Sequence, residues 1–214
     1  MMKFYRLIIT VFCLSWIISA QLAAYGKTPE KKYNAIIIQA AGYPPEGEKP
    51  EEGTDAVTQA TTKGINTYTL TTSLIKKLNA ADIAATVLPH TSCKDLKCLT
   101  DGSRGRTDLL IFAGPSHFSK QPPQLTKLYR RVKDVVKTNP KLICSTLVPA
   151  WYPDTKGKDT IKVAAKAFEK EGASVVEGVS ILTPRGKKKG ADTKEVEAAL
   201  IAFTDRISAA LSKN

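Results

Sequence analysis

The sequence predicts an α/β protein with a doubly wound, five-stranded parallel sheet in the strand order 2-1-3-4-5, covered by helices as a three-layer α/β/α structure. Three observations predict this fold. Five short segments are rich in isoleucine, valine and leucine at nearly every position, as in strands that are buried on both faces. Segments with helical spacing of apolar residues alternate with them. The 214 residues show no internal repeat and suffice for one such domain.

The first two strands are separated by a long loop and a helix. Residues 34–41 (NAIIIQAA) form the first predicted strand, and residues 83–88 (IAATVL) form the second. Apolar residues at positions 70, 74, 75 and 78 have helical spacing, so an amphipathic helix is expected after Gly64. Residues 42–61 contain three prolines and four glutamates, and a loop of this length indicates either a function or an insertion.

The remaining elements continue the alternation. The third strand is predicted at 109–113 (LLIFA), the fourth at 141–148 (KLICSTLV) and the fifth at 174–182 (SVVEGVSIL). Pro122 and Pro123 open a helix that runs through Val136, because proline suits a first helical turn. A further helix is expected from Asp159 to the residue before Gly172, and the last helix at 192–211.

The N-terminal residues differ from the rest of the chain. Lys3 and Arg6 are followed by an apolar stretch at 7–20, and small residues stand at Ala20, Ala24 and Gly26. This pattern predicts a secretory signal peptide at 1–26 and a mature domain at 27–214. The mature protein would then be exported, periplasmic or secreted, and would have no stable membrane span after cleavage. An uncleaved anchor helix is the alternative interpretation.

Three cysteines follow the predicted signal peptide. Cys93 and Cys98 flank the polar segment KDLK and can form a local disulfide in an oxidising compartment. A redox-active pair and a metal site are the alternatives, although two thiols without nearby histidines do not fill a zinc site. Cys144 lies in an apolar run, which predicts a buried free thiol.

The chain is basic, with a formal net charge of +12 that falls to +10 when Lys3 and Arg6 are removed. A basic protein can attract nucleic acid, anionic lipid or acidic partners. The lysines are interspersed with glutamates along the predicted helices, and the densest basic run is 185–189 (RGKKK). We therefore interpret the charge as a solvated surface, with a polyanion site as the alternative. Nucleic acid is not an expected partner of an exported protein.

Ligands of doubly wound sheets bind beyond the carboxyl ends of the strands, at the switch point between the first and third strands. The loop after the first strand ends in TTKGINTYTL (61–70), at the start of the predicted helix. Free backbone N–H groups and the helix dipole make such a start an anion site. Thr62, Asn66 and Thr67 would add donors and Lys63 a charge, whereas N-capping by Asn66 or Thr67 is the alternative.

Two further loops reach the same switch point. In GPSHF (114–118) the glycine would allow a ligand to approach the backbone, and His117 and Phe118 would offer a flat face unless Phe118 packs in the core. In the loop after Val148, Trp151 and Tyr152 either pack on a planar ring or cover the following helix. Together the three loops fit a phosphorylated planar ligand.

Three segments resemble the flavodoxin-like superfamily, and most closely its NAD(P)H-dependent FMN reductase branch. TTKGINTYTLTTSL resembles the phosphate loop of that family. DLLIFAGPSHFSKQPPQLTKLYRRV resembles its central strand, turn and helix, and KLICSTLVPAWYPDTKGKDTIKVAAKAFEKEGASVV resembles its next strand, loop and helix. The resemblance spans residues 34–211.

The resemblance implies FMN as the cofactor, which carries the electrons while the protein binds and orients it. No acid–base side chain is then required. The resemblance places the FMN phosphate at Thr62, Lys63, Asn66 and Thr67. It places the isoalloxazine ring against Pro115, Ser116, His117, Phe118, Leu147 and Trp151.

Together with the predicted signal peptide, the resemblance implies an exported FMN-binding protein that acts in electron transfer or flavin-dependent reduction. Its redox partner would be a protein or a quinone-like acceptor. A homodimer is also implied. Whether the chain is an FMN-dependent oxidoreductase is left open, because cytosolic NAD(P)H is not available outside the cell. The alternative is a flavin-free flavodoxin-like binding or scaffold module, because loop 42–61 is long and His117 replaces the usual tyrosine. A Ser/His hydrolase is not expected without a G-x-S-x-G motif.

Overall fold

The structure is a computed structural model, and it describes residues 31–40, 67–101, 105–116, 119–150, 155–183 and 191–214. The chain divides into two compact units, residues 1–31 and residues 32–214. The fold below is that of the second unit. The predicted signal peptide lies outside the described residues and stays a prediction. Within the described ranges, no helix is both long enough and apolar enough to cross a membrane.

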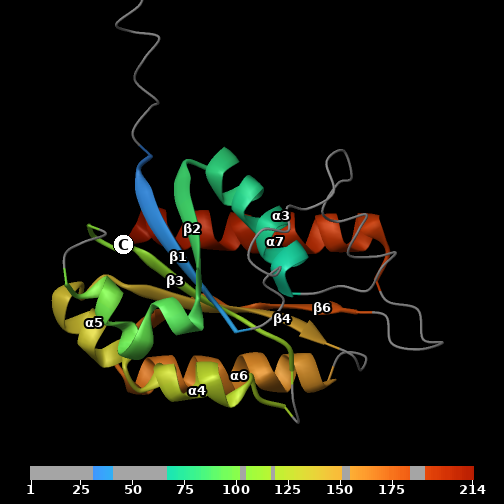
Figure 1. The fold of residues 1–214 in the computed structure, drawn as a ribbon. Coiled ribbons are helices and arrows are strands. Elements are labelled where there is room, and N and C mark those ends of the chain that lie inside the picture. Colours follow the sequence, from blue (N-terminus) through green and yellow to red (C-terminus); the bar gives the residue numbers. More distant parts are fainter. Residues whose placement is uncertain (1–30, 41–66, 102–104, 117–118, 151–154, 184–190) are drawn as a thin grey trace, which may run out of the picture. The chain divides into compact units, whose positions relative to one another are not determined.

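A parallel sheet forms the middle layer of residues 32–214 (Figure 1). Its strands are β1 (Tyr33–Gln39), β2 (Ile83–Pro89), β3 (Leu109–Ala113), β4 (Ile143–Ala150), β5 (Ser174–Val175) and β6 (Val179–Leu182). The strand order is β2-β1-β3-β4-β5, and β6 also pairs with β4. This order confirms the predicted 2-1-3-4-5 arrangement, and the predicted third strand has the observed bounds.

The predicted fifth strand, 174–182, is wrong as a continuous element, because a bulge divides it into β5 and β6. Cys144 pairs with Val175, and Leu147 pairs with Val179. The two pairs are three residues apart on β4 but four residues apart on the segment that contains β5 and β6. One extra residue of this kind defines a β-bulge. Gly178 lies in the bulge, where a Cβ atom would be only 2.2 Å from Thr146 Oγ1. The close approach of the two strands therefore requires a glycine.

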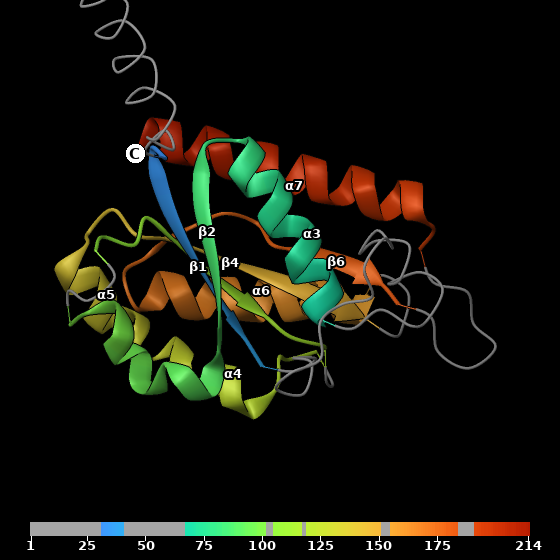
Figure 2. The same cartoon turned by 45° about the horizontal axis from the view of Figure 1, so that its top comes forward.

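Helices cover both faces of the sheet (Figure 2). On one face lie α3 (Thr67–Ala80) and α7 (Thr193–Lys213), and on the other lie α4 (Pro123–Tyr129), α5 (Val132–Thr138) and α6 (Thr155–Lys170). The pleat of β1 separates the two cores, because alternate side chains point to opposite faces. Ile37 packs with the α3 and α7 core, whereas Ile36 and Ile38 pack with the other.

Several predicted boundaries are wrong by a few residues. Strand β4 is shifted from 141–148 to Ile143–Ala150, and α6 begins at Thr155 instead of Asp159. The helix predicted from Pro122 to Val136 is two helices, because the amide of Arg131 donates to the Leu128 carbonyl in a tighter turn. Helix α7 begins as predicted after Asp192, whose carboxylate accepts from the Glu195 amide in a capping box.

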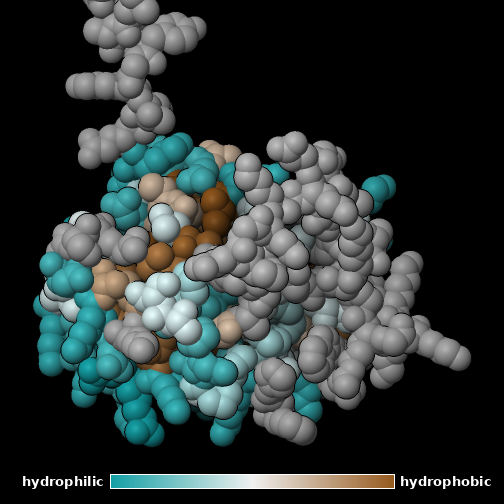
Figure 3. Space-filling model, viewed as in Figure 1, coloured by the Kyte–Doolittle hydropathy of each residue, from teal (hydrophilic) through white to brown (hydrophobic). Residues whose placement is uncertain are grey.

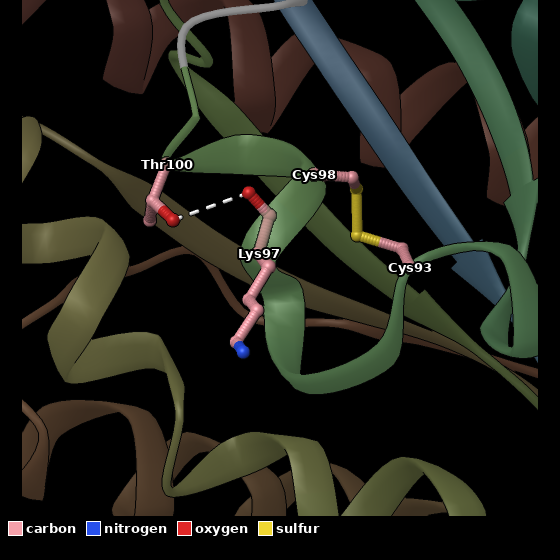
Figure 4. The surroundings of a disulfide bond; sticks show 4 residues. All are labelled: Cys93, Lys97, Cys98 and Thr100. Carbon is pink, nitrogen blue, oxygen red and sulfur yellow. Dashed lines mark hydrogen bonds between the residues drawn. A yellow bond between two sulfur atoms is a disulfide. The ribbon is translucent and has the colours of Figure 1, made fainter.

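The segment between β2 and β3 contains two short 3-10 helices, η1 (His90–Ser92) and η2 (Lys94–Leu99). Cys93 and Cys98 are joined by a disulfide across η2, which confirms the predicted local disulfide (Figure 4). Leu96 has a φ of 56°, in the left-handed region, yet its side chain is fully buried in the core. Cys144 is a buried free thiol, as predicted.

The basic residues are unevenly placed: acidic residues are interspersed with the lysines of α6, as expected, but the lysines outnumber them. Helices α4, α5 and α6 contain eight lysines against three acidic residues, whereas α3 and α7 together contain five basic and three acidic residues. The lysines on the α4–α6 side are Lys127, Lys133, Lys137, Lys156, Lys158, Lys162, Lys166 and Lys170. Positive charge therefore accumulates on one helical layer.

Candidate functional site

The candidate site lies at the carboxyl edge of the sheet, where β1 ends at Gln39, β3 at Ala113 and β4 at Ala150. The chain after β1 leads to α3 on one face, and the chain after β3 leads to α4 on the other (Figure 1). This divergence makes the switch point at which doubly wound sheets bind ligands. The structure therefore places the end of β1, the start of α3 and residues 114–116 of the second predicted loop at one edge.

The first turn of α3 is anchored to the end of β1. Thr67 is buried at the start of the helix, and the Thr71 hydroxyl donates to Gln39 Oε1 over 2.6 Å as well as to the Thr67 carbonyl. The first turn contains no acidic residue. The anchoring fixes the direction of the helix axis, and the positive end of the helix dipole lies at the switch point. Thr62, Lys63 and Asn66 lie outside the described residues.

The second loop is tied to β4 and α6. The amides of Gly114 and Ser116 donate to the carbonyls of Leu147 and Pro149, over 3.1 and 3.0 Å. The Ser116 hydroxyl is 2.7 Å from Thr160 Oγ1 and 3.3 Å from the Lys156 carbonyl oxygen. Pro115 has no amide hydrogen, so residues 114–116 have no backbone donor left for a ligand. His117 and Phe118 lie outside the described residues.

The predicted reason for Gly114, close approach of a ligand to the backbone, is wrong. A Cβ atom at this position would be 2.8 Å from Leu125 Cδ1 and 3.3 Å from Pro122 Cδ. The space beside the glycine is therefore filled by the start of α4. Gly114 is required so that α4 can pack closely on the end of β3.

A buried glutamine, which the sequence interpretation missed, holds the second loop from below. Gln121 Nε2 donates to the carbonyls of Phe112 and Gly114, over 2.9 and 3.4 Å, and Gln121 Oε1 accepts from the Tyr129 hydroxyl. Burial raises the pKa of Tyr129 well above its ordinary value. The Tyr129 ring packs against Phe112 and Phe168, with centroids 5.1 and 4.8 Å away. The sequence signal for this buried polar contact was Tyr129, which follows Leu125 by one helical turn on the apolar side of α4.

The third loop begins above a fully packed strand end. Leu147 is fully buried in the core between the sheet and the α3 and α7 layer, so its side chain supports the edge from inside. At the start of α6, a Cβ atom on Gly157 would be 1.8 Å from Ser180 Oγ. Gly157 therefore brings α6 against β6. Trp151 and Tyr152 lie outside the described residues.

One pocket is separate from the candidate site. A shallow pocket of about 270 Å³ lies between the C-terminal end of α3 and α7, at the opposite edge of the sheet. It is lined by Lys77, Ala80, Ala81, Ile201, Thr204 and Asp205.

Within the described residues, no group of three or more His, Cys, Asp or Glu side chains could hold a metal ion. The candidate site therefore consists of a helix start and loops, without a metal centre in the described part.

The sheet order and its helical layers define the flavodoxin-like fold. Solved structures with this fold are similar to the chain. Rubredoxin oxygen:oxidoreductase from Desulfovibrio gigas has a TM-score of 0.56 and 13% identity, over 86% of this chain and 38% of that one. The flavodoxin of Streptococcus pneumoniae TIGR4 has a TM-score of 0.52 and 15% identity, over 82% of this chain and 98% of that one.

A third similar structure is RosB, with a TM-score of 0.53 and 10% identity over 85% of this chain and 79% of that one. RosB was solved with a bound intermediate, 8-demethyl-8-formylriboflavin-5'-phosphate. The chain spans about two fifths of the length of the Desulfovibrio protein. No protein-family model matches the chain, and no curated protein matches it. At these identities the likeness establishes the fold alone.

Proposed function

We propose that the chain is an exported FMN-binding flavodoxin-like protein that acts in electron transfer or flavin-dependent reduction. One observation carries the proposal: the start of α3, fixed by the Thr71–Gln39 hydrogen bond, lies at the switch point and follows the segment TTKGIN. Switch points of doubly wound sheets bind ligands, and helix starts bind phosphate. The bound flavin of RosB, which carries a phosphate, supports the same ligand class.

The residues at the helix start fit a phosphate group. The first turn of α3 contains no acidic side chain that would repel it, and Thr67 begins the helix. Thr62, Lys63 and Asn66 would supply hydroxyl, ammonium and amide donors, and Thr67 would contribute the helix start. We assign the ring to Pro115, Ser116, His117, Phe118, Leu147 and Trp151 as the resemblance implies. Of these, Ser116 and Leu147 would act as support, since their polar groups or side chains are already engaged. FMN, when bound, supplies the electron-transfer chemistry.

Export is supported by two features of the chain. The pattern of residues 1–26 is typical of a signal peptide. The Cys93–Cys98 disulfide fits an oxidising compartment, because cytosolic thiols are kept reduced. We infer a periplasmic or secreted protein that exchanges electrons with another protein or with a quinone-like acceptor. A homodimer is proposed from the family resemblance.

A second candidate function is a flavin-free binding or scaffold module. The observation that favours it is the second loop, where Gly114 and Ser116 donate both of their amides to β4. A loop that is closed onto its own sheet offers a flavin ring fewer donors. The two candidates differ in one measurable property, the affinity for FMN.

The test compares FMN with riboflavin, which lacks the phosphate. Titration of the chain from residue 27 onward, followed by flavin fluorescence, is expected to give tighter binding of FMN by at least about tenfold, since charge-assisted phosphate contacts contribute about 1.5–3 kcal/mol each. The variant Lys63→Gln should lose affinity for FMN and keep its affinity for riboflavin. The matched control Lys76→Gln, at the other end of α3, should change neither. Absence of binding of either flavin would contradict the proposal and favour the scaffold module.

A further inference from the structure

We propose that the exposed side of α4, α5 and α6 binds the surface of an anionic phospholipid bilayer by electrostatic attraction. We call this side the basic layer, and define it by the exposed lysines Lys127, Lys133, Lys137, Lys156, Lys158, Lys162, Lys166 and Lys170. The proposal does not depend on flavin binding. It rests on the spacing and exposure of these lysines, and on the charge of Lys162, Lys166 and Lys170, which form no ion pair within the described residues.

Four lysines form a row along α6. Lys158, Lys162, Lys166 and Lys170 are each four residues apart, and all four are exposed. Residues at this spacing lie on one side of an α-helix, so the row extends for about 18 Å at 1.5 Å per residue. The opposite side of α6 carries buried Ile161, Ala164 and Phe168. The row therefore points away from the sheet.

Three of the four lysines of this row, Lys162, Lys166 and Lys170, form no ion pair within the described residues. Lys77 on α3, in contrast, pairs with Glu197 on α7. Like charges four residues apart destabilise a helix, and a glutamate at that spacing would stabilise it. The acidic residues of α6, Asp159 and Glu169, lie three residues from Lys162 and Lys166, and they offset only part of the charge of the five lysines of α6. An external anionic surface would complement the remaining positive charge.

The neighbouring helices extend the same charge. Helix α4 lies beside α6, and α4 and α5 add Lys127, Lys133 and Lys137 to the exposed side (Figure 1). Asp134 is the acidic residue of α4 and α5, and it already pairs with Lys137 and Arg131. In Figure 3, hydrophilic residues follow the lower edge of the molecule, where α4 and α6 lie in the same view. The basic layer is therefore broader than one helix.

The composition of the basic layer fits a lipid surface better than a protein partner. Protein interfaces are depleted in lysine and enriched in aromatic residues that fill pockets. The aromatic residues of α4 and α6, Tyr129 and Phe168, are buried, and Val163, 40% exposed, is the one large apolar side chain exposed in the described part of these helices. Anionic headgroups need no shaped pocket, because every lysine near the bilayer adds to the attraction.

The test is co-sedimentation of the chain from residue 27 onward with vesicles. One set contains phosphatidylcholine alone, and the other contains about one part phosphatidylglycerol to three parts phosphatidylcholine, which supplies a negative surface potential. Binding is expected to the anionic vesicles alone, and added salt should abolish it because salt screens the charges. A polyglutamate competitor at low salt reports on acidic protein partners.

Two variants with the same loss of charge locate the surface. Lys162→Gln/Lys166→Gln/Lys170→Gln removes three cations from the row and should weaken binding about 100-fold, at about fivefold for each lysine. Lys76→Gln/Lys194→Gln/Lys213→Gln removes three exposed cations from α3 and α7 and should weaken binding less than about threefold. Glutamine and lysine have similar helix propensities, and thermal unfolding would confirm that both variants fold.

Three results would overturn the proposal. The first is absence of binding to anionic vesicles at low salt. The second is equal loss of binding in the two triple variants, which would indicate attraction by net charge instead of by the basic layer. The third is binding of polyglutamate without binding of vesicles, which would identify an acidic protein as the partner.

Discussion

The hydroxyl oxygens of Ser116 and Thr160 lie 2.7 Å apart and join the loop after β3 to the first turns of α6. The same serine donates its amide to the Pro149 carbonyl over 3.0 Å. The loop is thereby held at two points of the neighbouring segment, β4 and α6. This attachment gives the carboxyl edge a fixed shape before any ligand binds, which is the condition for preorganised binding.

Replacing Ser116 by alanine should lower the free energy of unfolding by about 1 kcal/mol, the typical contribution of a protein hydrogen bond. The remaining Thr160 hydroxyl keeps its bond to the Lys156 carbonyl, so the loss should stay modest. Urea denaturation measures the change. Ser212→Ala, at an exposed position near the end of α7, serves as the control and should leave stability unchanged. If Ser116→Ala and the unmodified chain had the same free energy of unfolding, the Ser116–Thr160 contact would not stabilise the protein.

Replacing Gly157 by alanine should destabilise the protein, although alanine is favoured over glycine in helices by about 1 kcal/mol. The new Cβ atom would lie 1.8 Å from Ser180 Oγ, and overpacking costs about 1–3 kcal/mol. The double variant Gly157→Ala/Ser180→Gly removes the clashing atoms. A double-mutant cycle should therefore show favourable coupling of at least about 0.5 kcal/mol. Additive effects of the two changes would show that the close contact is not responsible.

The disulfide predicts the thiol count of the chain from residue 27 onward. In denaturant without reductant, the chain from residue 27 should expose one reactive thiol, Cys144, and reduction should raise the number to three. The double variant Cys93→Ser/Cys98→Ser should lose about 2 kcal/mol of stability, the chain-entropy value for so short a loop. Three thiols before reduction would contradict the disulfide.

Stability should fall at alkaline pH because of Cys144. Burial raises the pKa of this thiol far above its ordinary value, so the folded state keeps a proton that the unfolded state loses. The unfolded state then binds fewer protons above about pH 9, and the free energy of unfolding falls there by up to about 1.4 kcal/mol per pH unit. Cys144→Ala should make this slope shallower by that amount. The free energy of unfolding of both proteins can be measured by urea denaturation between about pH 9 and 10.5. An equal dependence on pH in both would contradict the role assigned to Cys144.

Local sequence patterns predicted most elements because each depends on residues close in the chain. The strand order was predicted from the alternation of strands and helices, which is typical of the doubly wound class. The runs of β1 and β3 are apolar at nearly every position, which indicates burial on both faces. The bulge at Gly178 depends on its approach to Thr146 on another strand, and no local pattern contains that information. The roles of Gly114 and Gln121 likewise depend on α4 packing beside the end of β3.

The candidate site was predicted only in part. The switch point follows from topology, so the sequence placed it correctly at the ends of β1 and β3. The pairing of Ser116 with Thr160 joins positions 44 residues apart, and short-range patterns do not predict it. The lysine spacing on α6 was visible in the sequence, but its significance depends on which charges lie beside it in the fold.

The most direct test of the account is the absorbance and fluorescence of the purified chain from residue 27 onward, before and after addition of FMN. Oxidised flavin absorbs blue light, and a protein that encloses it alters the absorption band and the fluorescence. We predict saturable binding of one FMN per chain with altered spectra. Unchanged spectra in an excess of FMN would contradict the proposed cofactor and leave the flavodoxin-like fold with a different function.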